Sequence, residues 1–175
     1  MIIDISQEIL GCEVYPGDPR PKAEKQMDMG KGDLYNLSAF YMGAHNGTHI
    51  DAPSHFVKDG KTVDEIDFEA FVGLAYVAEH QGIVTGDDAV QLVEKAKAEN
   101  PEAAKRILIK GEAEVSLEAA QIFAASGMWL LGNESQTVGP EDAPMAVHLT
   151  LLGAGVILLE GVRLEKVPEG IYLLN

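Results

Sequence analysis

Three of the five histidines of the chain lie with one aspartate in a single short segment, MGAHNGTHIDAPSHF. These residues are His45, His49, Asp51 and His55. Imidazole nitrogens and carboxylate oxygens are ligands that Zn²⁺ and Mn²⁺ both accept. The residue types therefore indicate a divalent-metal site, unless the histidines have separate structural roles.

The spacing of these residues favours an extended chain over a helix. Gly47 and Pro53 both disfavour a helix across the segment. Side chains of an extended chain alternate between two faces, so His45, His49 and Asp51 would share one face if residues 45–51 are extended. Gly47 would then leave room for an ion between the two imidazoles. Pro53 would bend the chain, so the last histidine of the segment need not be a ligand.

Two further candidates, His148 and Glu160, lie far downstream. His148 is in the apolar stretch PMAVHLTLLGAG, and Glu160 closes the apolar run VILLE. An ionised carboxylate is costly to bury without a partner, so Glu160 needs a partner or water. Taken alone, each also has a structural explanation: a hydrogen-bonded core histidine, and a glutamate exposed at the end of a strand.

The elements that must position these residues follow an α/β pattern. Strands are expected at residues 1–6, 36–45, 74–80, 106–110, 128–132 and 156–160. Helices are expected at 87–98, capped by Asp87 or Asp88, at 117–126, with Ser116 as N-cap and Gly127 as stop, and at 144–155. Helices alternating with strands in the second half indicate some parallel pairing. We therefore expect one domain, residues 1–175, with a mixed β-sheet core and flanking helices.

Charge and composition narrow the choice of partners and compartment. The formal net charge of −15 makes nucleic acid and anionic membrane surfaces poor partners. The only cysteine, Cys12, can form no intramolecular disulfide, which fits a reducing cytoplasm. The N-terminus has no basic signal region, and no apolar run reaches the ~18 residues of a membrane span. These features favour a cytoplasmic protein that acts on a small molecule.

The histidine segment resembles the signature of a known family. Residues 45–56 read H-x-G-T-H-x-D-x-P-x-H-F, as in the cyclase-like metal-dependent hydrolases, which include bacterial kynurenine formamidase and isatin hydrolase. YPGDP (15–19) is similar to the family's W-P-G-D-x-P loop, and LLGNESQTVGPED (130–142) to its G-x-D-T-x-S stretch. His148 followed by Glu160 in ILLEGVRLEKVPEG resembles the family's closing motif. The match runs in the same order from residue 4 to residue 174.

The resemblance implies the family's swivelling β/β/α fold and a set of site residues. One metal would be held by His45, His49 and Asp51, and a second by Asp51, His148 and Glu160. His55 would be the general acid/base, and Tyr15 would contact the substrate. Five candidate ligands exceed the four of a closed zinc site, which favours a two-metal site with a bridging carboxylate. We expect one or two divalent ions per chain, with Zn²⁺ as the first choice and Mn²⁺ as the alternative.

The implied activity is hydrolysis of a C–N bond in a small amide, such as the arylformamide N-formylkynurenine. A metal-activated water would attack, with His55 moving the proton. A homo-oligomer, dimer or tetramer, is also implied. Alternatives are a ring-opening hydrolase of a cyclic amide or lactone, a dehydratase, a metal-binding but catalytically inactive member, and a structural domain with scattered histidines.

The chain departs from the family pattern at three places. Glu134-Ser135-x-Thr137 stands where relatives have D-T-x-S, and the longer glutamate should reach differently. The loop between Lys110 and Val115 is short and lacks the aromatic residues that shape the pocket of relatives. The sequence ends at IYLLN, before the family's P-L…D-G-x-P-x-R segment. This last departure predicts a sheet edge that is exposed or covered by a partner subunit.

Overall fold

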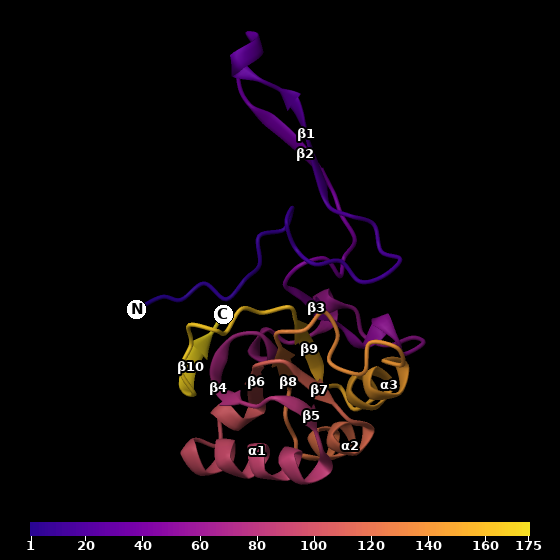
Figure 1. Cartoon of the computed structure of the whole chain (residues 1–175), viewed down its shortest axis with the longest axis vertical. Helices are drawn as coiled ribbons and strands as arrows, with labels where there is room; N and C mark the ends of the chain where they lie inside the picture. Colours follow the sequence, from indigo (N-terminus) through magenta and orange to yellow (C-terminus); the bar gives the residue numbers. More distant parts are fainter.

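A mixed six-stranded β-sheet organises the chain, whose 175 residues, Met1–Asn175, are all described by the computed structural model (Figure 1). The strand order is β10-β4-β6-β8-β9-β3. These strands are β3 (His49–Asp51), β4 (Gly73–Glu79), β6 (Arg106–Lys110), β8 (Leu130–Asn133), β9 (Ile157–Glu160) and β10 (Gly170–Leu174). The four central strands are parallel, and the edge strands β10 and β3 run antiparallel to them. The expected mixed sheet with parallel pairing is confirmed.

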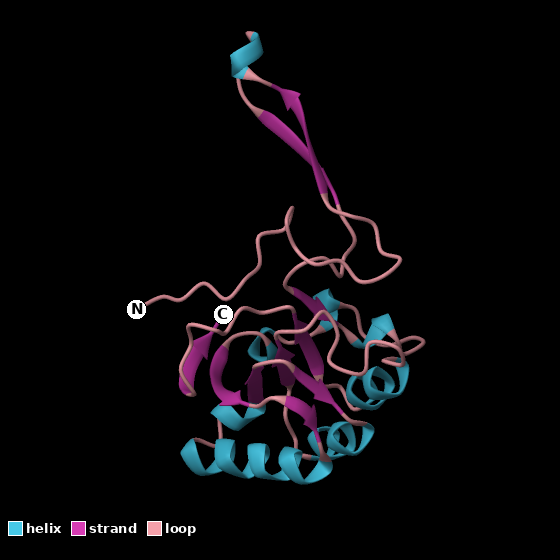
Figure 2. Cartoon of the chain, viewed as in Figure 1, coloured by secondary structure: helices cyan, strands magenta, loops and turns pink.

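Three α-helices cover one face of this sheet (Figure 2): α1 (Gly86–Glu99), α2 (Leu117–Ala125) and α3 (Met145–Gly153). Ser116 caps α2 as predicted. The prediction that Asp87 or Asp88 caps α1 is wrong, because Thr85 is the N-cap and Asp88 bonds back to its backbone in a capping box. None of the helices is long and apolar enough to cross a membrane.

Side chains of the central strands point alternately to the two faces of the sheet, so each face has its own hydrophobic core. Ile107 and Ile109 of β6 lie in the large cluster beneath the helices, whereas Leu108 between them lies in a smaller cluster on the opposite face. A strand buried on both faces is typical of parallel sheets. The apolar runs that predicted strands at 106–110 and 156–160 therefore mark the interior of the domain.

The second face is covered by irregular chain. Residues 1–6 form no strand, so the strand predicted there is wrong. Ile3 and Ile5 still pack on the smaller core, but only one backbone hydrogen bond, from Arg163 N–H to the carbonyl of Ile5, ties this segment to its neighbour. Alternation alone placed the two isoleucines correctly, while a strand also needs a continuous ladder of such bonds.

A two-stranded antiparallel ribbon projects from the body of the molecule (Figure 1). It consists of β1 (Lys22–Met27) and β2 (Leu37–Tyr41), and a 3₁₀ turn, Met29–Lys31, lies near its tip. The extended conformation predicted for 36–45 holds only within β2. A small parallel pair, β5 (Gly82–Val84) and β7 (Ala113–Val115), lies apart from the main sheet. Further 3₁₀ turns are Pro53–His55, Val63–Glu65, Phe68–Ala70 and Ala103–Lys105.

Candidate metal centre

Edge strand β3 presents His49 and Asp51 side by side. Both side chains are buried, and the period of two puts them on the same face. Antiparallel pairing with β9 places His49 directly opposite Glu160. The Nε2 atom of His49 lies 3.4 Å from Oε2 of Glu160 and 3.5 Å from Oδ1 of Asp51. Two residues distant in sequence are therefore brought together by strand register.

His45 reaches the same place through a turn. The prediction that residues 45–51 are extended is wrong for its first half, because the strand begins only at His49. Gly47 has a φ of +69°, and a Cβ there would meet Ile9 at 2.9 Å, so the glycine serves the turn and not an ion. The turn still brings Nδ1 of His45 to 2.9 Å from Oδ1 of Asp51.

Helix α3 contributes His148 from the other side. Its Nδ1–H donates to the carbonyl of Pro144 at 2.9 Å, one turn back along the helix. This leaves Nε2 at 3.3 Å from Oε1 of Glu160 and 3.6 Å from Oδ2 of Asp51. His49 is held in the same way, with Nδ1 3.0 Å from the carbonyl of Gly47. Such outer hydrogen bonds fix the orientation of metal-binding imidazoles.

The candidate ligand atoms form two overlapping groups. His45, His49 and Asp51 make one, Asp51, His148 and Glu160 the other, and within each the ligand atoms lie within 4.8 Å of one another. Oδ2 of Asp51 and Nε2 of His49 are buried without a hydrogen-bond partner, and the closest contact of Oδ1 of Asp51 is with Nδ1 of His45. Buried polar atoms are costly to leave unpaired, and a divalent cation would satisfy both unpaired atoms. The residues fit a metal.

The electrostatics of the cluster favour a cation. Burial acts to raise the pKa of Asp51, but the contact with His45 and the neighbouring imidazoles outweigh it and lower the pKa. Burial acts to lower the pKa of His49 and His148, but their contacts with Glu160 outweigh this effect. The pKa of each imidazole is therefore raised above its ordinary value of 6.5. The carboxylates thus stabilise positive charge on the imidazoles. Protons and metal ions compete for such ligands.

His55 lies beside the two groups and belongs to neither. It ends the 3₁₀ turn that Pro53 begins, and its ring packs on that of His45 with centroids 4.1 Å apart. Its Nε2 is 3.7 Å from Oδ2 of Asp51, and a third of its side chain is exposed. Burial, with the positive charges of His45 and His148, lowers its pKa from 6.5 despite the opposing charge of Asp51. The imidazole is therefore neutral at pH 7, as a proton acceptor must be.

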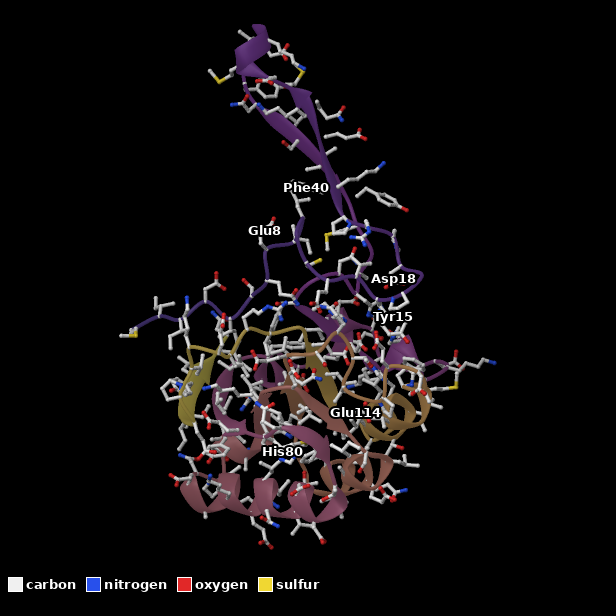
Figure 3. All side chains as sticks on the ribbon, viewed as in Figure 1. Glu8, Tyr15, Asp18, Phe40, His80 and Glu114 are labelled. Carbon is white, nitrogen blue, oxygen red and sulfur yellow. The ribbon has the colours of Figure 1, made fainter.

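Except for His49, these residues line a pocket of about 250 Å³, most of whose lining residues are polar. Tyr15 is on its wall, where its hydroxyl donates to the carbonyl of Glu141 at 2.9 Å. Asp18 also lines the pocket, and Figure 3 shows it near Tyr15 at the base of the ribbon. The sequence analysis assigned no role in the site to Asp18, or to Gln136 and Thr137, which also line the pocket. All three lie within the two family-like motifs at residues 15–19 and 130–142. Those motifs were the sequence signal that could have identified them.

Glu134, the departure from the family's aspartate, joins two loops behind the pocket. One carboxylate oxygen accepts a hydrogen bond from Gly111 N–H and the other from Leu164 N–H, each at 2.7 Å. Gly111 lies in the short loop after β6, and Leu164 lies in the segment after β9. The longer side chain therefore reaches both loops. The glutamate that replaces the family's aspartate thus has a structural role in holding them together.

Substituting Glu134 with alanine is expected to destabilise the protein by about 2 kcal/mol, because two partly buried N–H groups lose their acceptor. The change in the free energy of unfolding is measured by chemical denaturation, with circular dichroism as the signal. Glu165→Ala removes an exposed glutamate in the same region and should change the free energy of unfolding by less than ~0.5 kcal/mol. Equal stability of the two variants would show that the bridge contributes nothing.

The fold and this cluster define an α/β protein with a histidine–carboxylate centre suited to a divalent metal. The family model described as "Putative cyclase" matches residues 3–139. A kynurenine formamidase of Bacillus cytotoxicus is 31% identical over 98% of this chain and 87% of that relative. The chain therefore belongs to the cyclase family, and the resemblance drawn from the histidine motif is confirmed.

Solved structures agree with this assignment. One described as a potential metal-dependent hydrolase with cyclase activity is 28% identical, with a TM-score of 0.78, over 98% of this chain and 86% of that one. Isatin hydrolase A from Labrenzia aggregata, solved with benzyl benzoate, is 20% identical with a TM-score of 0.72, over 98% and 85%. The second likeness concerns the fold alone. Together they confirm the predicted fold class.

Proposed function

We propose that this protein is a metal-dependent hydrolase that cleaves the C–N bond of a small amide. The observation that carries the proposal is Asp51, whose two carboxylate oxygens are buried and which both ligand groups share. The formamidase relative from Bacillus cytotoxicus supports an amide as substrate. The structural domain with scattered histidines is disfavoured, because all five candidate ligands converge.

The metal would be held by His45, His49 and Asp51, with room for a second ion at Asp51, His148 and Glu160. Nitrogen and carboxylate ligands suit Zn²⁺ and Mn²⁺, and we propose Zn²⁺ first. When bound, such an ion lowers the pKa of its water to ~7 and stabilises negative charge on a carbonyl oxygen. The chain's own residues hold the ligand geometry and move the proton.

We assign the proton transfer to His55. Its Nε2 faces the centre next to Asp51, and its imidazole is neutral at pH 7, so it can accept a proton there. The same atom can then return the proton to the leaving nitrogen. Tyr15, fixed by its bond to Glu141, would contact the rest of the substrate. A pocket of about 250 Å³ limits that substrate to a small molecule.

A substrate panel tests the proposal. It contains formyl-anilides including N-formylkynurenine, isatin-like cyclic amides, and lactones, each offered to protein loaded with Zn²⁺ or Mn²⁺. We expect the highest kcat/KM for an N-formyl arylamide. Turnover confined to the rings would assign a ring-opening hydrolase instead. Stoichiometric metal without turnover of any panel member would contradict the proposal and favour an inactive metal-binding protein.

We further propose that residues 1–175 act as one domain, in the cytoplasm, as a homo-oligomer that is a dimer or a tetramer. The single free cysteine supports a reducing compartment. The extensive exposed apolar surface supports association of copies.

A further inference from the structure

A second cavity, of about 600 Å³, adjoins the pocket of the metal centre. It is called the outer compartment below, and its walls come from the segments 12–20 and 135–141 and from Glu114. Tyr15, Gln136 and Thr137 line both cavities, so a molecule can extend along them from one into the other. The pocket at the metal centre, about 250 Å³, is below the ~300–1,000 Å³ of most small-molecule sites. A substrate that places its amide at the metal therefore has room for its remainder in the outer compartment.

The wall shared by the two cavities is fixed by hydrogen bonds on both sides of Thr137. The side-chain amide of Asn133 donates to the carbonyl of Thr137 at 3.1 Å. The N–H of Val138 donates to Oε1 of Glu160, a candidate metal ligand, at 2.7 Å. The position of the wall relative to the metal centre is thus set before a ligand binds. Such preorganisation reduces the cost of ordering side chains on binding.

The same wall carries buried polar atoms that the chain itself does not satisfy. Thr137 is only 9% exposed, and its Oγ1 has no hydrogen-bond partner. Oε1 and Nε2 of Gln136 are also buried without a partner. Buried polar groups in folded proteins are nearly always paired, and each exception needs an explanation. A polar molecule bound where the two cavities meet would supply the missing partners.

The outer compartment is negatively charged. Three glutamates and one basic residue line it, so its formal charge is −2: Glu13, Glu114, Glu141 and Arg20. Figure 3 shows Glu114 on the body below Tyr15. None of these glutamates forms an ion pair within the chain. Their charge is therefore free to act on a ligand, and a cleft with an excess of one sign of charge attracts ligands of the opposite sign.

We propose that the outer compartment binds an ammonium group of the substrate, so that the protein prefers small amides that carry a positively charged amine. The glutamates belong to neither candidate metal group, so the cation they suit is an organic one and not a further metal ion. An ammonium group has three N–H donors, and charge-assisted hydrogen bonds to carboxylates are the strong ones. The proposal rests on the proposed amide hydrolysis and adds which amides are favoured.

Three matched formanilides test this preference. They differ only at the end of a two-carbon ring substituent, which carries an ammonium, a hydroxyl or a carboxylate group. With metal-loaded protein at pH 7 and low salt, we expect kcat/KM to be at least ~10-fold higher for the ammonium than for the hydroxyl substrate, through a lower KM, and lowest for the carboxylate. Added salt should reduce the difference, because it screens the charges. Equal kcat/KM for the ammonium and hydroxyl substrates would overturn the proposal.

Substitutions locate the preference in the outer compartment. Glu114→Gln should lower the ratio of the ammonium to the hydroxyl kcat/KM at least ~3-fold, as expected for a partly exposed ion pair, and adding Glu141→Gln should lower it further. Tyr15 bonds only to the backbone carbonyl of Glu141, so that bond is kept. Glu112→Gln, an exposed position outside the compartment, is the matched control and should keep the wild-type ratio. A ratio that the double substitution leaves unchanged would place the ammonium group elsewhere and overturn the proposal.

Binding measured without turnover separates this proposal from the hydrolytic function. The anilines that the ammonium and hydroxyl substrates would release are titrated into the full chain by calorimetry. We expect tighter binding of the ammonium-bearing aniline, and loss of this difference in the double variant. That result without hydrolysis of any formanilide would support the outer compartment and contradict only the hydrolase. Hydrolysis with equal binding of the two anilines would overturn the outer compartment and leave the hydrolase standing.

Discussion

Asp51→Asn is expected to remove bound metal and hydrolysis together. Both groups of candidate ligands depend on Asp51, and asparagine keeps its size but replaces one ligand oxygen with an NH₂ group that cannot bind a cation. Loss of even an outer partner of a metal ligand costs ~10–100-fold in affinity or activity, so a shared ligand should cost at least ~100-fold in both. Metal analysis after dialysis and a hydrolysis assay measure the two effects.

Asp87→Asn is the control for this experiment. Asp87 is exposed in the first turn of α1, and its loss should change neither metal content nor turnover. Both variants must show the far-ultraviolet circular dichroism spectrum of the wild type, so that a loss of metal is not due to unfolding. If Asp51→Asn retained both metal and turnover, the assignment of the whole site would be wrong, because no other residue joins the two ligand groups.

His55→Gln is expected to lower turnover by ~10²–10⁴-fold, the usual contribution of a positioned general acid/base, with metal content unchanged. The structure places His55 beside Asp51 but outside both ligand groups, which separates it from the histidines that would bind metal. His80→Gln is the control, because His80 is in neither ligand group and does not line the pocket. Figure 3 shows it on the body, away from Tyr15. Loss of metal in the His55 variant would make it a ligand and contradict its assigned role.

The pH dependence gives a second readout for His55. Burial lowers its pKa below 6.5, and a bound cation would lower it further because like charges disfavour protonation. His55 is therefore a base above that pKa and is protonated below it, so wild-type turnover should fall as the pH drops through a value under 6.5. This acid limb should be missing from the residual activity of His55→Gln. An identical limb in the variant would assign it to another group.

Local signals predicted most of the body of the protein. The apolar stripe of α1, Ser116 before α2, and the short apolar runs of β6 and β9 each depend on neighbours in sequence. The alternation of His49 and Asp51 was also sufficient to place them on one face. Such features follow from the periods of helix and strand, which the sequence carries directly.

Non-local features could not be predicted in this way. Opposition of His49 and Glu160 depends on the register of β3 with β9, and only the family resemblance pointed to it. The turn at Gly47 was interpreted as extended chain, because a glycine between two histidines fits either conformation. The ribbon of β1 and β2 was missed as a unit, since its strands are exposed on both faces and lack the apolar alternation that marks a half-buried strand.

The most direct test of the central claim is removal and return of the metal. Protein is stripped with a chelator, its metal content and amide hydrolysis are measured, and Zn²⁺ or Mn²⁺ is then titrated back. We expect the stripped protein to be inactive, and activity to return with one or two ions bound per chain. Full activity in protein shown to be free of metal, or failure to bind either ion, would contradict the account.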